Sequence, residues 1–182
     1  MSLKLCFCRL LGAGLAVALA PSAFAFDSVS FELGGGDNTQ VARIGLQSRW
    51  HKQWLQSNGT HLGGYWDLTL SQWRWTPAQG ATNTNENLID IGITPVLRLQ
   101  SDSRKGFYAE VGIGAHLLSS DFYNSEGQRF STRFQFGDHF GLGYVMQNGV
   151  DLSLKIQHFS NGGIKQPNPG VLFGVLKLGY AF

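Results

Sequence analysis

Apolar and polar residues alternate with a period of two through most of this chain, and such alternation predicts β-strands. The run Asp-Leu-Ser-Leu-Lys-Ile-Gln-His-Phe-Ser at residues 151–160 puts leucine and isoleucine on one face and serine, lysine and glutamine on the other. Turn-forming or polar segments separate the runs. Eight strands are expected, at residues 27–36, 40–52, 61–74, 88–99, 107–117, 130–146, 151–160 and 171–182.

The N-terminal segment reads as a secretory leader. An apolar run at residues 10–20 follows two positive charges and precedes a small-x-small sequence that ends at Ala25. That run is too short to cross a bilayer comfortably. We expect a signal peptide at residues 1–25 and a mature domain at residues 26–182, the alternative being a retained N-terminal anchor.

Charge and cysteine content change once the leader is removed. The chain has 14 Lys and Arg against 12 Asp and Glu, and Lys4 and Arg9 fall in the leader, so the mature chain is formally neutral. This balance gives no argument for nucleic-acid binding. Both cysteines, Cys6 and Cys8, also lie in the leader, which leaves the mature chain no disulfide or cysteine metal site.

The strand pattern fits a membrane barrel, although a soluble sandwich would alternate similarly. The predicted strands approach the roughly 9–11 residues that cross a bilayer at a tilt. Export by the leader and a terminal phenylalanine after alternating apolar residues also favour the outer membrane. Aromatic residues gather near strand ends, as in interfacial girdles. They are Trp50, Trp54, Trp73, Trp75, Tyr180 and Phe182.

The polar faces fit the narrow, filled lumen of such a barrel, where opposite charges can pair. Glycines separate the charged residues on these faces. The residues concerned are Arg43, Arg49, Arg98, Arg133, Glu32, Glu110 and Asp67. We therefore predict an all-β fold, an eight-stranded antiparallel transmembrane barrel of the outer membrane.

Two polar residues, His158 and Ser160, interrupt the apolar row of the seventh strand. Their Cα atoms should lie about 6–7 Å apart, at twice the rise per residue, and a neutral imidazole could then take the hydroxyl proton. With both termini periplasmic, this strand runs outward and carries the pair to the outer leaflet. The alternative is that both residues lie in the headgroup zone, where polar side chains are ordinary.

The segment His-Phe-Ser-Asn-Gly-Gly-Ile-Lys-Gln-Pro-Asn-Pro-Gly at residues 158–170 resembles the corresponding segment of the lipid A 3-O-deacylase (PagL) family. Residues 64–67 and 136–143 are similar too. The resemblance implies an outer-membrane barrel that hydrolyses the ester-linked 3-hydroxyacyl chain at position 3 of lipid A, without a metal or other cofactor. The expected partners are lipopolysaccharide and the outer membrane, with no nucleic acid and with a homodimer left open.

The resemblance also implies residue roles. Ser160 would be the nucleophile and His158 the general base, while Asn161 and the backbone N–H of Gly163 would stabilise the oxyanion. An Asn-Gly-Gly sequence is equally typical of a simple turn.

One position departs from the family pattern. Leu172 stands where the family has a glutamate that orients the histidine, and the last strand has no carboxylate. The chain would then work as a dyad or use another acid, and Asp138 interrupts the apolar row of the sixth strand. A three-residue turn at 147–149 would pair Asp138 directly with His158. A bulge near Gly137 would instead turn Asp138 away.

Two other functions remain open from the sequence. The chain could be a non-enzymatic structural barrel, or a deacylase homologue without activity, as the missing glutamate would allow. It could also be a phospholipase-like outer-membrane esterase with the same Ser160 and His158 pair, for which calcium dependence would argue.

Overall fold

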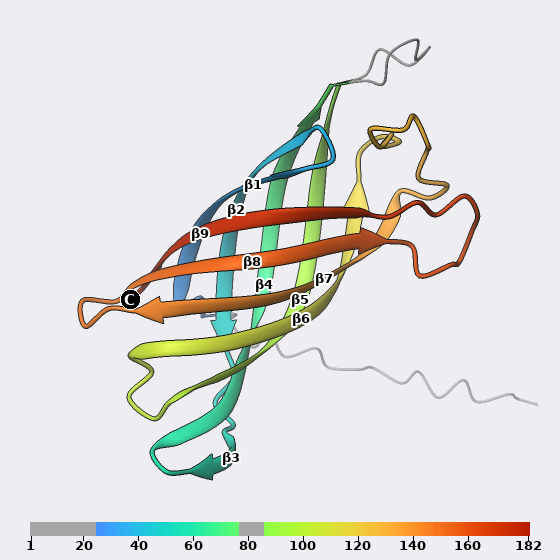
Figure 1. Ribbon diagram of the computed structural model, residues 1–182. Coiled ribbons are helices and arrows are strands. Elements are labelled where there is room, and N and C mark those ends of the chain that lie inside the picture. The colour runs from blue at the N-terminus through green and yellow to red at the C-terminus, as the bar shows by residue number, and fades with distance from the viewer. Residues whose placement is uncertain (1–24, 77–85) are drawn as a thin grey trace, which may run out of the picture.

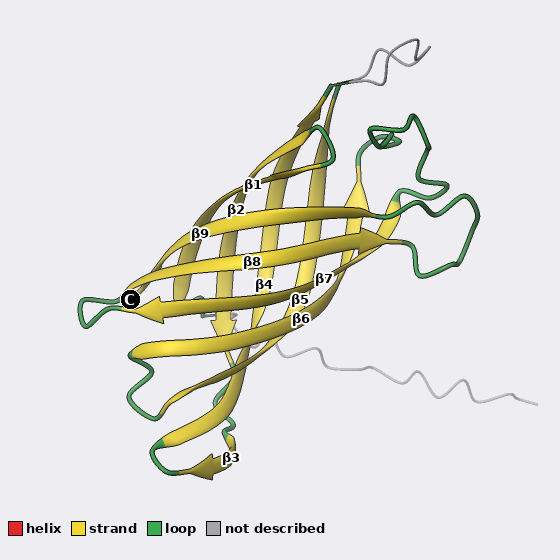
Figure 2. Ribbon diagram, viewed as in Figure 1, coloured by secondary structure: helices red, strands yellow, loops and turns green. Residues whose placement is uncertain are grey.

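The computed structural model describes residues 25–76 and 86–182, and the predicted signal peptide lies outside them apart from Ala25. These residues form strands joined by turns and loops (Figures 1 and 2). Within these two ranges no helix is long and apolar enough to cross a membrane. The strands are β1 (Ser28–Gly36), β2 (Thr39–Arg49), β3 (Trp54–Ser57), β4 (Thr60–Trp75), β5 (Asn87–Ser101), β6 (Gly106–Leu118), β7 (Phe134–Val145), β8 (Val150–Ser160) and β9 (Val171–Ala181).

Eight of these strands close into an antiparallel barrel. The order runs β2-β1-β9-β8-β7-β6-β5-β4, and a β2–β4 pairing completes the ring. The predicted fold class is thereby confirmed. The additional strand, β3, lies in a segment between two predicted strands where a polar turn was expected. It pairs with the start of β4. Asn58 and Gly59 between them have φ of 50° and 75°, and positive φ at both central residues suits a tight hairpin.

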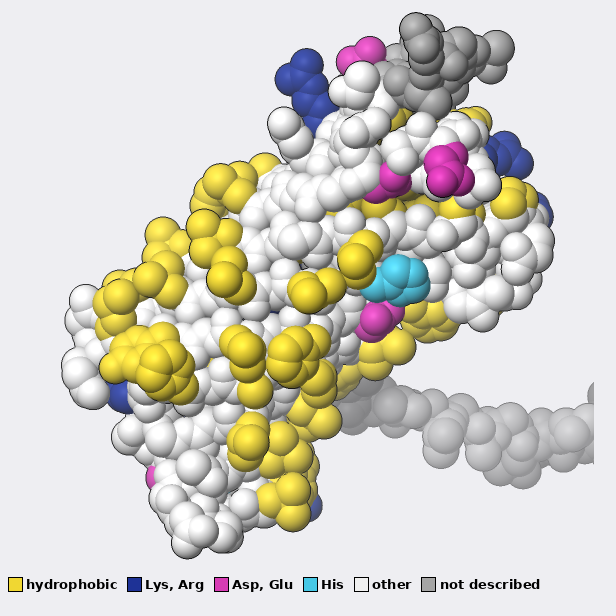
Figure 3. Space-filling view, in the orientation of Figure 1, with side chains coloured by type: hydrophobic (Ala, Val, Ile, Leu, Met, Phe, Trp, Pro, Cys, Tyr) yellow, Lys and Arg dark blue, Asp and Glu magenta, His cyan; other side chains and the backbone are white. Residues whose placement is uncertain are grey.

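The two faces of each strand have opposite chemistry. In β8, Leu152, Leu154 and Ile156 are exposed on the outside, while Ser153 and Lys155 are buried in the lumen. Apolar side chains are spread over the outer surface of the barrel (Figure 3). This inside-out distribution is that of a protein whose outer face meets lipid, and it rules out a soluble sandwich.

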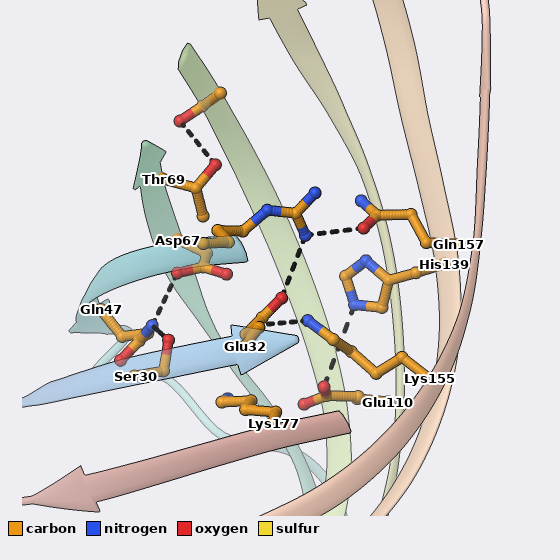
Figure 4. Close-up of polar contacts among 12 residues, drawn as sticks. Ser30, Glu32, Gln47, Asp67, Thr69, Glu110, His139, Lys155, Gln157 and Lys177 are labelled. Carbon is orange, nitrogen blue, oxygen red and sulfur yellow. Dashed lines mark hydrogen bonds and ion pairs between the residues drawn. The ribbon is translucent and has the colours of Figure 1, made fainter. Parts of the chain in front are cut away.

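Paired charges fill the lumen (Figure 4). The carboxylate of Glu32 accepts hydrogen bonds from Arg43 at 3.0 Å and from Lys155 at 2.6 Å. Arg98 donates to Glu110 at 2.7 Å in a second ion-paired group of the lumen. The expected pairing of lumen charges is confirmed at these positions.

Two of the residues expected in the lumen behave differently. Arg133 lies in the β6–β7 loop, since β7 begins one residue later, and its half-exposed side chain is 3.4 Å from Asp121. Arg49 ends β2 and lies at the barrel mouth, only partly buried.

Trp73 and Trp75 correct the expectation of an aromatic girdle. Both side chains are buried inside the barrel rather than placed at a membrane interface. They continue the inward row of β4, so the alternation itself sends them into the lumen. Trp54, Tyr180 and Phe182 are exposed, as a girdle requires. We call the interior group the aromatic plug: Trp73, Trp75, Phe122, Phe130, Phe159 and Phe173.

The plug closes the barrel end that carries the β6–β7 and β8–β9 loops. Phe122 of the β6–β7 loop packs edge-on against Trp73, with ring centroids 5.5 Å apart. Phe159 of β8 packs against the same indole at 4.7 Å. Phe159 lies between His158 and Ser160 in the chain, so its burial anchors the end of β8 from within.

The Glu32 cluster gives a stability prediction. Glu32→Ala leaves Arg43 and Lys155 buried without their shared carboxylate, which costs about 3–5 kcal/mol when a buried pair is broken. We expect this loss in the free energy of unfolding in detergent, followed by the heat-dependent shift in electrophoretic mobility.

Asp121→Ala is the matched control, because Asp121 pairs only at the exposed surface. It should change the free energy of unfolding by about 0–1 kcal/mol. Equal stability of the two variants would contradict a structural role for the Glu32 cluster.

Candidate active site

The β7–β8 hairpin has the register that the sequence predicted. Met146 donates its N–H to the carbonyl of Val150 at 2.7 Å, which closes the expected turn. The pairing then continues without a shift to Phe136 and Ser160, and Asp138 faces His158. The alternative of a bulge at Gly137 is therefore wrong.

Asp138 and His158 are hydrogen-bonded on the outer face of the barrel. Nδ1 of the imidazole lies 3.1 Å from Oδ1 of the carboxylate. The side chains are 41% and 50% exposed for the histidine and the aspartate, so the pair is open to molecules beside the barrel. In Figure 3 the histidine surface on this face lies against an acidic side chain, with apolar surface on either side. A proton held on Nδ1 leaves Nε2 as the acceptor.

Ser160 follows His158 on the same outward row, one residue pair closer to the β8–β9 loop. Its Oγ accepts a long hydrogen bond of 3.4 Å from the N–H of Gly162. Within the described residues it is not hydrogen-bonded to His158, so the expected Ser160–His158 contact is not made in this structure. Catalytic hydrogen bonds often tighten only when substrate binds.

Gly170 makes room for the free edge of the imidazole. A Cβ added there would lie 2.8 Å from Nε2 of His158, and the residue has φ of 71°. Both the close approach and the left-handed backbone favour glycine at this position.

Asn161 organises the loop that follows the serine. Its buried side chain donates to the carbonyl of Lys165 at 2.8 Å and to Oγ of Ser131 at 3.1 Å. Its Oδ1 accepts the N–H of Gly163 at 2.9 Å. Both groups expected to stabilise an oxyanion are thus engaged within the loop, and the N–H that donates to Ser160 Oγ belongs to Gly162.

The loop contacts include residues that the sequence did not single out. Asn168 accepts the backbone N–H of Asn161 at 2.9 Å, and its place in the Lys-Gln-Pro-Asn run was a usable signal. Ser131 comes from the β6–β7 loop, thirty positions before Asn161. No pattern in the sequence connects Ser131 to the site.

Leu172 lies on the other side of the histidine. It pairs with His158 across β8 and β9, as Asp138 does across β7 and β8. The outward row therefore reads Asp138, His158, Leu172. Among the described residues, one carboxylate is hydrogen-bonded to His158, that of Asp138, which comes from the strand opposite to the family's glutamate position.

The arrangement provides a hydroxyl, a base and an acid in the order that nucleophilic ester hydrolysis requires. In residues 25–76 and 86–182 no group of three or more His, Cys, Asp or Glu side chains is placed to hold a metal ion. Fold and site together define an outer-surface hydrolase-like centre on a membrane-type β-barrel.

Comparison with known proteins identifies the family. The family model for "Lipid A 3-O-deacylase (PagL)" matches residues 40–181. Lipid A deacylase PagL of Bordetella bronchiseptica is 34% identical over 92% of this chain and 89% of its own length. The protein of the same name from Pseudomonas aeruginosa is 31% identical over 75% of each chain. This chain belongs to the PagL family.

A solved structure agrees with this assignment. The crystal structure of the outer membrane enzyme PagL superimposes with a TM-score of 0.71 and 25% identity, covering 85% of this chain and 99% of that one. The present chain is accordingly an outer-membrane β-barrel.

The close approach at Gly170 yields a test of the imidazole's position. Gly170→Ala places a methyl group against Nε2 of His158 and should displace the ring. We expect covalent labelling of Ser160 by a fluorophosphonate probe to slow by about tenfold or more, as for a misplaced catalytic base.

Gly59→Ala is the control, because Gly59 also has positive φ but open space around it. It carries the same backbone strain without touching the site. Labelling as fast in Gly170→Ala as in Gly59→Ala would show that Gly170 does not position the ring.

Proposed function

We propose that this chain is a lipid A 3-O-deacylase that works as a serine esterase. Its proposed substrate is the ester-linked 3-hydroxyacyl chain at position 3 of lipid A. The observation that carries the proposal is the outward-facing group of Asp138, His158 and Ser160 on the surface that meets lipid: Asp138 lies across from His158, and Ser160 follows on the same face of β8. A lipid ester can reach this group sideways, from within its own leaflet.

The proposed reaction has two halves: acylation of Ser160, and hydrolysis of the acyl-enzyme. Ser160 Oγ attacks the carbonyl carbon of the ester, and its proton passes to Nε2 of His158. Asp138 stabilises the resulting imidazolium through the Nδ1 hydrogen bond. Collapse of the tetrahedral intermediate expels the sugar oxygen, which takes the proton from Nε2. Water, deprotonated by the same histidine, then hydrolyses the acyl-enzyme.

The oxyanion role of Asn161 and Gly163 is part of the proposal. Asn161 supports it by folding the glycine turn beside Ser160, through its contacts to Lys165 and Ser131. The N–H of Gly162 donates to the oxygen that attacks, at 3.4 Å. The N–H of Gly163 would have to exchange its bond with Asn161 for one with the substrate.

We also propose the orientation and the mature boundaries. The loop end of the barrel, with the catalytic group, faces outward, and the signal peptide at residues 1–25 is removed to leave the barrel at residues 26–182. The intact mass of the purified barrel tests this boundary. Asp138, His158 and Ser160 come from one chain, so a homodimer would add to this site without being a condition for it.

The phospholipase-like alternative uses the same two residues, Ser160 and His158. It differs in the ester that is cleaved, so the lipid products distinguish the two functions directly.

Lipid A released from cells that express the wild type or Ser160→Ala tests the activity. We expect mass spectra from wild-type cells to lose one 3-hydroxyacyl chain, and spectra from Ser160→Ala cells to keep it, because the nucleophile is absent. Unchanged lipid A in both strains, with the barrel folded in the outer membrane, would favour the non-enzymatic alternative. Lysophospholipid in place of deacylated lipid A would favour the phospholipase-like one.

The acid can be tested by moving it. Asp138→Asn should lower kcat about 100-fold or more, since a triad without its acid loses the orientation and the charge that support the base. Adding Leu172→Glu to this variant places a carboxylate on the other neighbour of His158 and should restore part of the activity. Deacylation measured on purified lipid A checks both variants.

Leu172→Gln in the Asp138→Asn background is the matched control, because it has the shape of glutamate without the charge. Restoration by glutamine as well as by glutamate would mean that packing, and not an acid, had been lost. Full activity of Asp138→Asn alone would show that the chain works as a dyad.

A further inference from the structure

The catalytic strand β8 has two unlike sides on the outer surface. On the β7 side, Asp138 stands beside His158, and Phe140 is the next residue of that outward row. On the β9 side, Leu172 stands beside His158, and the next outward residue is Gly174. β7, β8 and β9 lie side by side in Figure 1.

The imidazole itself distinguishes the two sides. Its Nδ1 is held by Asp138 on the β7 side. Its Nε2 has no hydrogen-bond partner in the described residues and faces Gly170, the residue that leads into β9. A general base must lie next to the hydroxyl and ester between which it transfers the proton. The reacting ester should therefore lie at the β9 side of His158.

A hollow lies one outward row beyond Leu172 on the barrel surface. Gly174 pairs with Ile156 on one side and with Gly35 of β1 on the other, so two adjoining outward positions carry no side chain. A Cβ added at Gly174 would meet nothing within 4 Å. The next outward row, about 6.7 Å farther along the strands, is occupied by Leu176 and Leu33.

The borders of this hollow are apolar and exposed. Ile156, Leu172, Leu176 and Leu33 all project from the barrel on its outer face. At the level of Gly174, the β7 side instead carries the exposed ring of Phe140.

We propose that the acyl chain to be cleaved lies over Gly174, on the β9 side of the catalytic strand, and that Gly174 sets the chain length that the enzyme accepts. This inference rests on the proposed deacylase function and adds the location and the determinant of acyl recognition. In this arrangement the acid and the acyl chain occupy opposite sides of His158. Leu172, in the place of the family's glutamate, forms the apolar wall at the entrance.

Gly174→Leu tests the determinant. The Cβ of the leucine meets nothing within 4 Å and its side chain enters the hollow on the outer face, so the barrel should fold as the wild type does. With 3-hydroxytetradecanoyl and 3-hydroxydecanoyl esters of lipid A, the ratio of kcat/KM for the long chain over the short chain should fall by about tenfold or more.

Ala115→Leu is the matched control. Ala115 is an exposed outward residue of β6, two strands from His158 on the β7 side. The variant carries the same leucine side chain on the outer face and should keep the wild-type ratio. An unchanged ratio in Gly174→Leu, or a fall in Ala115→Leu instead, would overturn the proposal.

A binding measurement separates this inference from the catalytic one. Folded Ser160→Ala protein in detergent is mixed with a lipid A analogue that carries a diazirine along its 3-linked acyl chain, irradiated and digested. Labels on Leu176 or Leu33 support the β9 side. Labels on Phe140, or labels without preference, contradict it. If the Ser160→Ala protein is labelled at the β9 side but the wild type cleaves no ester, the proposed catalysis is wrong and the proposed acyl site stands.

Discussion

The ladder of backbone hydrogen bonds between neighbouring strands fixes nearly every other feature of this barrel. Side chains alternate across each strand, so the register of a pair decides which residues meet and on which face. Closure by β2 and β4 removes the free edges and makes each register depend on its neighbours. A shift of one residue at β7 and β8 would send Asp138 or His158 into the lumen and separate the two side chains.

The lumen stabilises that register from within. The inward residues beside His158 are Gln157, which accepts a hydrogen bond from Arg43 at 2.6 Å, and Phe159 of the aromatic plug. The lumen contacts of Gln157 and Phe159 thus fix the position of β8, whose outer face carries His158. A polar network and an aromatic cluster in the lumen thus hold the strand that carries the proposed catalytic side chains.

Much of this architecture could be predicted from the sequence, because a period of two is a strong signal where one face meets lipid and the other is polar. The pairing of Asp138 with His158 followed from matching apolar residues across a three-residue turn. Contacts between distant loops carry no such period. The burial of Phe122 and the contact of Ser131 with Asn161 depend on how the β6–β7 loop folds over the barrel end, which alternation does not describe. For the same reason, the sequence did not predict that the Asn161 side chain is already hydrogen-bonded to Ser131 and Lys165.

The aromatic plug has a consequence for transport. Many outer-membrane barrels of larger size conduct ions through a water-filled lumen. Here Trp73, Phe122 and Phe159 are fully buried across one end of the barrel, and ion-paired side chains fill the space below them. Ions would find no continuous column of water through the barrel. Reconstituted in a planar bilayer, the protein should therefore conduct no measurable ion current. A barrel of this kind leaves the permeability barrier of the outer membrane intact.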